Sequence, residues 1–157
     1  MDQINVRTAK SDDLAILLTF EQGVINFERT FDTTLKEGEI HYYDIAEMIK
    51  APHIEVVVAV LNNEIVGSGY ARIETSKIYL KHPKHAYLGF MYVKPEHRGK
   101  GVNQKIIEAL KQWAISQGIT ELKLDVYNDN LPAIKAYEKI GFTKLLVEMR
   151  MGLTPGN

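Results

Sequence analysis

The chain has 157 residues, of which 45% are hydrophobic and 25% charged, and its formal net charge at neutral pH is −1. This length predicts one domain over residues 1–157 with a full hydrophobic core, and the balanced charge argues against a nucleic-acid partner. The absence of cysteine excludes disulfides, thiolate metal sites and a cysteine nucleophile. No apolar run has membrane-spanning length and no signal pattern opens the chain, so we expect a cytoplasmic protein without a membrane partner.

The first half of the chain predicts helices and then a strand pair. The β-branched run 54–61 is typical of a strand covered on both faces, and Asn62-Asn63 suits a tight turn into its partner strand. Glycines in that partner strand indicate a bulge or close packing. In order, we expect a strand at 4–8, a helix at 12–27 with Ser11 as N-cap, a loop at 33–38, a short helix at 42–48 ending near Pro52, and strands at 54–61 and 64–74.

The second half predicts two further helices between strands. Residues 121–127 alternate apolar and polar side chains, as a half-buried strand does. In order, we expect a polar loop at 75–84, a strand at 85–93, a helix at 102–117 stopped by Gly118, a strand at 121–127, a helix from the cap Asn130 to Gly141, a last strand at 142–151 and a frayed tail at 152–157.

A basic, glycine-punctuated turn joins the strand at 85–93 to the helix that follows. Gly99 and Gly101 let the main chain curl and let a ligand approach it, while Arg98 and Lys100 add positive charge. Backbone N–H groups and a helix N-terminus at one point favour an anion, so the turn indicates phosphate binding. An ordinary strand–helix connection is the alternative. The P-loop and dinucleotide fingerprints are both absent.

A second motif, Asn130-Leu131-Pro132-Ala133-Ile134-Lys135-Ala136-Tyr137-Glu138-Lys139-Ile140-Gly141-Phe142, lies downstream. Together with Arg98-Gly99-Lys100-Gly101-Val102, it resembles the acetyl-CoA-binding core of the GNAT superfamily of N-acetyltransferases. The resemblance implies an α/β (α+β) fold of the GNAT acyl-CoA N-acyltransferase type, a mixed and splayed β-sheet flanked by helices. Asn103 departs from the pattern, because the family usually has a small residue there. It is expected to cap the helix or to contact a phosphate.

The resemblance also implies a reaction: direct transfer of an acetyl group from acetyl-CoA to a primary amine in a ternary complex. Tyr137 matches the family tyrosine that protonates the departing thiolate, although its helical spacing alone favours simple packing. Asn130 matches the asparagine that touches the pantetheine arm. The other expected cofactor contacts are the strand end, Met91, Tyr92 and Val93, for pantetheine, and the turn, Arg98, Gly99, Lys100, Gly101, Val102 and Asn103, for the pyrophosphate.

No general base is evident. Gly89 occupies the position at which many family members carry a glutamate. The remaining candidates are His85, Tyr92, Tyr127, Glu55 and Glu74, and an amine of low pKa needs no strong base. The alternative hypothesis is therefore a GNAT-fold module that senses acyl-CoA with weak catalysis.

Acceptor selectivity in this family comes from the first helices and nearby loops. The acceptor is expected to be a small-molecule or peptide amine, and the sequence does not identify it. Dimers are frequent in the family, which leaves a homodimer open. Histidines and carboxylates lack metal-ligand spacing, so no metal is expected. The candidate substrate residues are Glu28, Tyr42, Tyr43 and Tyr127, with Glu21, Asp32, His41 and Asp44 as further amine-binding candidates.

Overall fold

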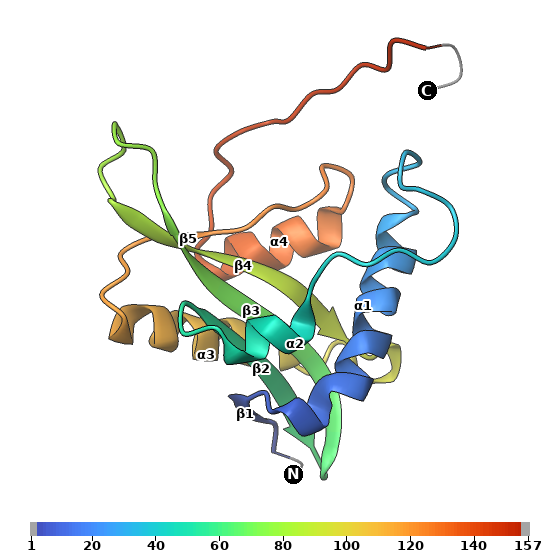
Figure 1. Cartoon of the computed structure of the whole chain (residues 1–157), viewed down its shortest axis with the longest axis vertical. Helices are drawn as coiled ribbons and strands as arrows, with labels where there is room; N and C mark the ends of the chain where they lie inside the picture. Colours follow the sequence, from blue (N-terminus) through green and yellow to red (C-terminus); the bar gives the residue numbers. More distant parts are fainter. Residues whose placement is uncertain (1–2, 155–157) are drawn as a thin grey trace.

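The computed structural model describes residues 3–154 and has a mixed sheet between helices (Figure 1). Within those residues, no helix combines the length and apolar character that a membrane span requires. The elements are β1 (Asn5–Thr8), η1 (Ser11–Asp13), α1 (Leu14–Glu28), α2 (Ile45–Lys50), β2 (Ile54–Leu61), β3 (Glu64–Thr75), β4 (Lys84–Val93), η2 (Pro95–His97), α3 (Val102–Ser116), β5 (Leu122–Lys123) and α4 (Leu131–Ile140).

The sheet runs in the order β1-β2-β3-β4-β5. The first four strands are antiparallel neighbours, and β5 joins β4 in parallel through two residue pairs, Ala86 with Leu122 and Tyr87 with Lys123. The β2–β3 turn places Asn62 and Asn63 at φ 51° and 64°, as the sequence predicts. The sheet is therefore mixed, as the resemblance implied.

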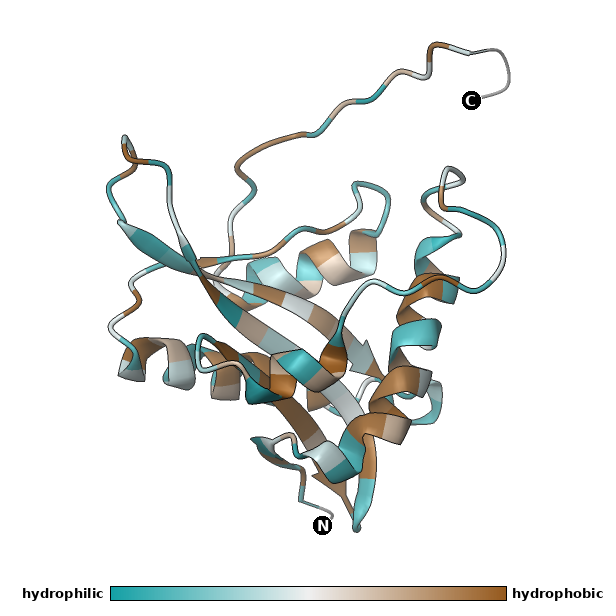
Figure 2. Cartoon of the chain, viewed as in Figure 1, coloured by the Kyte–Doolittle hydropathy of each residue, from teal (hydrophilic) through white to brown (hydrophobic). Residues whose placement is uncertain are grey.

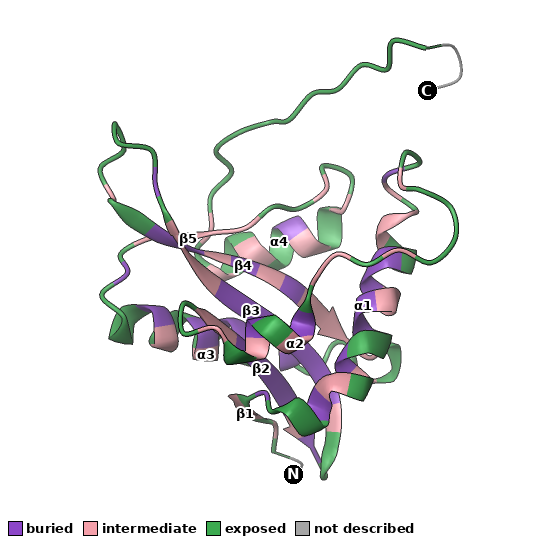
Figure 3. Cartoon of the chain, viewed as in Figure 1, coloured by how far each residue is buried: buried purple, intermediate pink, exposed green. Residues whose placement is uncertain are grey.

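Helices cover both faces of the sheet and create two apolar cores. Strand β2 contributes Val57 and Ala59 to the core under α3, and Val56 and Val58 to the core under α1 and α2. Figure 2 shows the apolar residues concentrated on the strands and the facing sides of the helices, and Figure 3 shows the same regions buried. The prediction that β2 is covered on both faces is confirmed.

Close packing explains the glycine in the middle of β3. A Cβ at Gly69 would lie 2.7 Å from Cγ2 of Ile106 on α3 and 2.9 Å from Sδ of Met91 on β4. Opposite Gly69, the β3–β4 register shifts and Phe90 adopts φ 55°, which marks a bulge in β4. The Ser68 hydroxyl donates a hydrogen bond of 3.1 Å to the Phe90 carbonyl and fixes this bend.

Beyond the bulge the sheet splays. Since β5 pairs only with residues 86 and 87, the β5-facing edge of residues 88–93 has no strand partner within the described chain. This open edge ends at the glycine turn and the N-terminus of α3. The splay therefore places free backbone groups of β4 beside the turn.

Three boundary predictions were wrong. The short helix is α2 at 45–50 instead of 42–48, because Asp44 caps it by accepting the Glu47 N–H at 3.3 Å. Ser11 is not an N-cap; the Asp13 carboxylate accepts the Lys10 N–H at 2.8 Å and pairs with Arg7. The strand expected at 121–127 is reduced to Leu122–Lys123, because β4 diverges from the chain after these pairs.

The last predicted strand does not form. Residues 142–151 are assigned to no strand and extend away from the sheet, exposed along their length except for half-buried Phe142 (Figure 3). None of the strands among the described residues pairs with this segment, and an extended segment without a neighbouring strand does not form a β-strand despite its alternating pattern. Of the tail expected at 152–157, residues 152–154 are exposed and 155–157 lie outside the described residues.

Candidate active site

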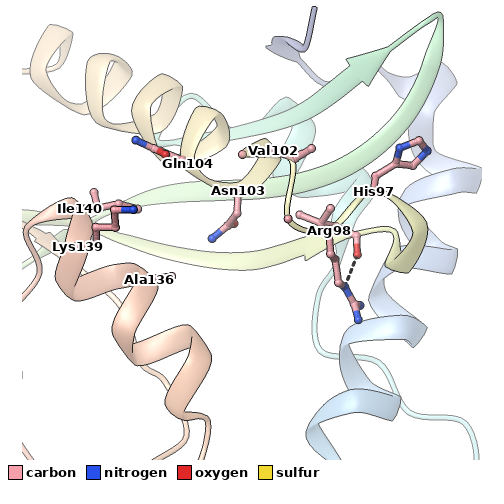
Figure 4. Close-up of a pocket in the computed structure, with 11 residues that line it drawn as sticks. His97, Arg98, Val102, Asn103, Gln104, Ala136, Lys139 and Ile140 are labelled. Carbon is pink, nitrogen blue, oxygen red and sulfur yellow. Dashed lines mark hydrogen bonds between the residues drawn. The ribbon is translucent and has the colours of Figure 1, made fainter. Parts of the chain in front are cut away.

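A cavity of about 500 Å³ lies between the β4 end, the N-terminus of α3 and the last turns of α4 (Figure 4). It combines residues from both sequence motifs, which are thirty residues apart in the chain. Its lining consists of Val93, His97, Arg98, Gly99, Gly101, Val102, Asn103, Gln104, Ala136, Lys139 and Ile140.

The glycine turn presents open backbone to this cavity. Gly99 and Gly101 have φ 78° and 84°, in the left-handed region that favours glycine, and no atom lies within 4 Å of a Cβ built at either position. Gly101 is the N-cap of α3 and offers no side chain to the first-turn N–H groups. These donors and the positive end of the helix dipole remain available to an anion.

Two anchors hold the turn against the sheet. The Lys94 N–H donates to the Val66 carbonyl at 2.8 Å, and the Lys94 ammonium pairs with Glu64 at 2.8 Å. The Arg98 side chain bends back to donate from Nε to the Val93 carbonyl at 3.1 Å (Figure 4). Lys100 Nζ lies 3.2 Å from His97 Nδ1 and does not line the cavity. Arg98 therefore holds the turn to the end of β4 through its hydrogen bond to Val93.

Asn103 occupies the first turn of α3, so the N-cap role predicted for it is wrong. Its side chain points toward α4 (Figure 4). The Oδ1 atom is buried and has no hydrogen-bond partner within the described protein. A buried polar atom without a partner is unusual, and one that lines a cavity is available to a ligand donor.

Helix α4 brings the second motif to the cavity. The Asn130 side chain caps the helix by accepting the Ala133 N–H at 3.4 Å. Tyr137 packs edge-to-face on Phe142 with ring centroids 6.0 Å apart. Burial raises the pKa of Tyr137, and a side-chain hydrogen bond from Asn103 opposes this rise. The phenol thus keeps its proton at neutral pH.

A buried carboxylate organises the segment between α1 and α2. Glu21 is fully buried; it accepts the backbone N–H groups of Tyr42 and Tyr43 at 2.8 and 2.9 Å and contacts His41 Nδ1 at 2.8 Å. The hydrogen bond to Glu21 raises the pKa of His41. Glu21 therefore has a structural role here, and the sequence offered no signal for this contact twenty residues away.

The predicted substrate residues gather around Glu28 at the end of α1. Burial raises the pKa of Glu28, a hydrogen bond from Tyr42 opposes the rise, and the charge of Asp32 adds to it. The Glu28 charge also raises the pKa values of Tyr127 and Tyr137, so these phenols lie within its electrostatic reach. Glu28 is thus the acceptor candidate whose charge reaches the α4 tyrosine.

Aromatic rings frame this carboxyl group. Tyr127 stacks on Phe31 with centroids 5.5 Å apart, and Tyr43 packs against Tyr42 and Phe90. Burial raises the pKa values of both Tyr42 and Tyr43 well above the ordinary range. The sequence analysis did not single out Phe31, because its stacking partner Tyr127 lies nearly a hundred positions away in the chain.

Comparison with known proteins identifies the family. The model of the Acetyltransferase (GNAT) family matches residues 23–142, more than two thirds of the chain. The chain belongs to the GNAT acetyltransferase family.

GNAT relatives cover most of this chain. The thialysine N-epsilon-acetyltransferase of Bos taurus is 27% identical over 149 residues, which span 88% of this chain and 83% of the relative. The N-alpha-acetyltransferase of Saccharolobus solfataricus is 31% identical over 147 residues, 90% of this chain and 81% of the relative. Homologues named as N-acetyltransferases support acetyltransferase activity at the level of the family.

Solved structures share the fold. A mutant of the BH1408 protein from Bacillus halodurans superimposes with a TM-score of 0.85 at 17% identity, over 96% of this chain and 99% of that one. Aminoglycoside N-acetyltransferase AAC(6')-Iy, solved in complex with CoA, gives a TM-score of 0.72 at 18% identity, over 94% and 99%. Both show the same GNAT architecture of a mixed sheet flanked by helices.

Gly89 lies on β4 at the position where many GNAT members carry a glutamate. The space beside it is occupied by a side chain from the neighbouring strand β3. A Cβ at Gly89 would lie 2.6 Å from the ring of Tyr70, which is buried opposite it in β3. The other base candidates have partners elsewhere. His85 contacts Ser76 and Glu74 at the far end of β4, Glu55 accepts from Thr8, and Tyr92 packs on Phe20. His85 lies eight residues before Val93, about 26 Å along a strand.

One cluster of potential metal ligands was missed. Ligand atoms of Glu64, Glu96 and His97 all lie within 4.8 Å of one another, although Glu64 is on another strand and its spacing in sequence gives no hint. The Lys94 ammonium already pairs with Glu64 at 2.8 Å and supplies a positive charge there. The cluster therefore serves to hold the turn against the sheet.

Proposed function

We propose that the protein transfers an acetyl group from acetyl-CoA to a primary amine by direct transfer in a ternary complex. The observation that carries the proposal is the cavity at the splay of the sheet, where an unpaired strand edge, an open glycine turn and a helix N-terminus meet. These features offer many N–H donors to one extended, phosphate-bearing ligand. A cytoplasmic location remains a prediction.

The residues at the cavity fit acetyl-CoA. Free backbone along Met91, Tyr92 and Val93 suits a strand-like contact with the pantetheine amides, and the turn suits the pyrophosphate. The unpartnered Asn103 Oδ1 gives the ligand a buried acceptor. Acetyl-CoA supplies the activated thioester; the residues described here orient it and move protons.

Tyr137 is proposed as the general acid. Its raised pKa keeps the phenol protonated, and a thiol with pKa in the range of about 8–9 leaves as a thiolate that takes the phenolic proton. The hydrogen bond from Asn103 lowers the pKa of the phenol and so makes this transfer less uphill. Solvent then returns the proton to the phenolate. Asn103 is therefore proposed as a positioning residue for the acid.

Glu28 is proposed to bind the acceptor and take its proton. A half-buried carboxylate among aromatic rings attracts an ammonium group by charge and by cation–π contacts with the rings. Its raised pKa makes it a better base than an exposed glutamate. Tyr42, Tyr43 and Tyr127 are proposed to shape the pocket for the rest of the acceptor.

The names of the relatives suggest which classes of amine the protein acts on. Relatives are named for the ε-amine of thialysine, for an α-amine and for an aminoglycoside amine. Each offers a primary amine on a flexible or polar body, which suits a carboxylate ringed by phenols. We propose a small-molecule or peptide amine of this kind.

The test is amine-dependent release of CoA thiol, followed with a thiol reagent. Because the chain has no cysteine, the reagent reports the CoA thiol alone. We expect release with one of the three amine classes and a loss of about 10²-fold in kcat for Tyr137→Phe with little change in CoA affinity. Tyr79→Phe, a change at an exposed tyrosine, is the matched control. Full turnover in Tyr137→Phe would remove the acid role.

A second candidate function is an acyl-CoA sensor with weak catalysis. The observation that favours it is Tyr70, which fills the space where a glutamate on β4 would act. This hypothesis predicts acetyl-CoA binding, measured by calorimetry, without thiol release for any amine in the panel. Release above the uncatalysed rate with a defined amine rules it out.

A further inference from the structure

The loop between β3 and β4, residues 76–83, has an apolar tip that projects into solvent. Ile78 is 101% exposed, Tyr79 75% and Leu80 39%. Figure 2 shows hydrophobic residues at the end of this loop, which extends away from the sheet. The sequence analysis predicted only a polar connection here. Adjacent exposed apolar side chains bordered by polar ones mark a surface that contacts a partner or a membrane.

Positive charge borders the apolar tip. The loop and its junction with β4 hold three exposed lysines, Lys77, Lys81 and Lys84, and the chain has no aspartate or glutamate between positions 74 and 96. The Lys77 ammonium lies 5.9 Å from the centre of the Tyr79 ring. Charge and apolar surface are therefore adjacent at the tip, and the loop has no carboxylate of its own to offset its lysines.

Hydrogen bonds at the base hold the loop in place. The Ser76 N–H donates to the Pro83 carbonyl at 3.0 Å, and the buried Ser76 hydroxyl lies 2.8 Å from His85 Nδ1. His85 Nε2 lies 3.0 Å from Glu74, whose carboxylate also pairs with Arg72 at 2.7 Å. The charge of Glu74 is thus balanced inside the base and does not neutralise the lysines.

Two further contacts shape the exposed part of the loop. The Leu80 N–H donates to the Lys77 carbonyl at 2.9 Å and closes a tight turn at the tip. His82 Nδ1 lies 2.7 Å from the Thr120 hydroxyl, which ties the loop to the segment before β5. A loop held at its base, side and tip loses little conformational freedom on binding, so the apolar tip is pre-organised for contact.

We propose that the 76–83 loop is a peripheral docking site for the surface of an anionic phospholipid bilayer. At such a surface Ile78, Tyr79 and Leu80 enter the boundary between headgroups and acyl chains, while the lysines contact the anionic headgroups. Tyrosine favours this boundary because its ring is apolar and its hydroxyl stays hydrated. A bilayer surface thereby complements both the charge of the loop and its apolar tip.

The surroundings of the loop favour a bilayer over an acidic protein. Carboxylates of such a protein would pair with the lysines but leave three adjacent apolar side chains in water. The expectation of no membrane partner rested on the lack of a spanning segment, which a docking loop does not require. The loop and the cavity lie at opposite ends of β4, about 30 Å apart along the strand, so a bound bilayer leaves the cavity open (Figure 1).

The first test is co-sedimentation of the full chain with vesicles. We expect binding to phosphatidylcholine vesicles that contain phosphatidylserine, little binding to phosphatidylcholine alone, and release as the salt concentration is raised. Lys77→Glu with Lys81→Glu should weaken binding at least about tenfold, since each lysine near an anionic surface contributes about fivefold. Lys36→Glu with Lys50→Glu makes the same change in net charge at exposed positions outside the loop and should have a much smaller effect. Equal binding to both kinds of vesicle, no binding, or an equal loss in the two variants overturns the proposal.

The second test asks whether the tip enters the bilayer. Since the chain lacks cysteine, Ile78→Cys can carry an environment-sensitive dye as its single label. The dye should shift its emission to shorter wavelength with the anionic vesicles, whereas the same dye at Lys36→Cys should not. Ile78→Ser with Tyr79→Ser should weaken binding at least about tenfold while the circular dichroism stays native, because both side chains are exposed. An unshifted dye, or binding of polyglutamate as strong as that of the vesicles, overturns a lipid-docking role.

Discussion

At the residue scale, Glu28 combines burial with a charge that the proposed reaction requires. Its pKa is raised in the folded chain, mainly by burial. A carboxyl whose folded-state pKa is raised contributes stability below the pKa of the unfolded state and loses it as pH rises through the folded-state pKa. Above its folded-state pKa, the ionised Glu28 therefore destabilises the fold relative to a neutral group. Function and stability are opposed at this residue.

The variant Glu28→Gln should therefore be more stable and less active than the natural chain. We expect the Tm at pH 7 to rise by about 1–3 °C, a small gain because Glu28 is only half buried and solvent screens its charge. We expect kcat/KM to fall about 10²-fold and its acidic limb to disappear from the pH profile. Differential scanning fluorimetry and thiol-release kinetics measure both, with exposed Glu37→Gln as control. An unchanged pH profile would exclude Glu28 as the base.

At the element scale, a glycine in the left-handed backbone conformation stands at each end of α3, and only the one at the N-terminus lines the cavity. Gly101 has φ 84° at the N-terminus beside the cavity, and Gly118 has φ 77° just after the C-terminus. A Cβ at either position meets no atom within 4 Å. A side chain therefore costs each site the same backbone strain, while only Gly101 faces the proposed pyrophosphate site.

The variants Gly101→Val and Gly118→Val should therefore distinguish an effect on the free energy of unfolding from an effect on CoA binding. Both should lower the free energy of unfolding by about 1–2 kcal/mol, through the left-handed strain of a non-glycine residue. Gly101→Val should in addition weaken CoA binding at least about tenfold by crowding the turn, whereas Gly118→Val should leave it unchanged. Chemical unfolding and calorimetry provide the two readouts. Equal CoA affinity in both variants would remove the turn as the anion site.

At the scale of the whole molecule, one sheet carries two apolar cores. Strand β2 contributes Val57 and Ala59 to the core under α3, and Val56 and Val58 to the core under α1 and α2. Because both cores pack on the same strand, we expect Val57→Ala and Val58→Ala each to lower the free energy of unfolding by about 1–3 kcal/mol, in a single cooperative transition. Chemical unfolding followed by fluorescence and by circular dichroism measures this. Two separate transitions would show that the cores unfold independently.

The sequence anticipated most elements because their signals are local. The β-branched run of β2, the Asn62-Asn63 turn and the caps of α4 each depend on neighbours in the chain, and each is found where it was expected. The shortened strand at 121–127 and the missing strand at 142–151 failed for a shared reason. A strand needs a neighbouring strand, and the alternating pattern of one segment does not show whether the fold supplies one.

The sequence alone indicated the family, the order of the elements from β1 to α4 and the residues of the glycine turn, because motif spacing and backbone preferences depend on residues close together in the chain. Tertiary structure alone decided which side chains meet. In the folded chain, Tyr70 fills the space beside Gly89, and Glu21 accepts hydrogen bonds from backbone N–H groups. Folding also brings Glu28 within electrostatic reach of Tyr137. These relations join residues 19 to 109 positions apart. They depend on packing, burial and desolvation, which exist only once the chain has folded.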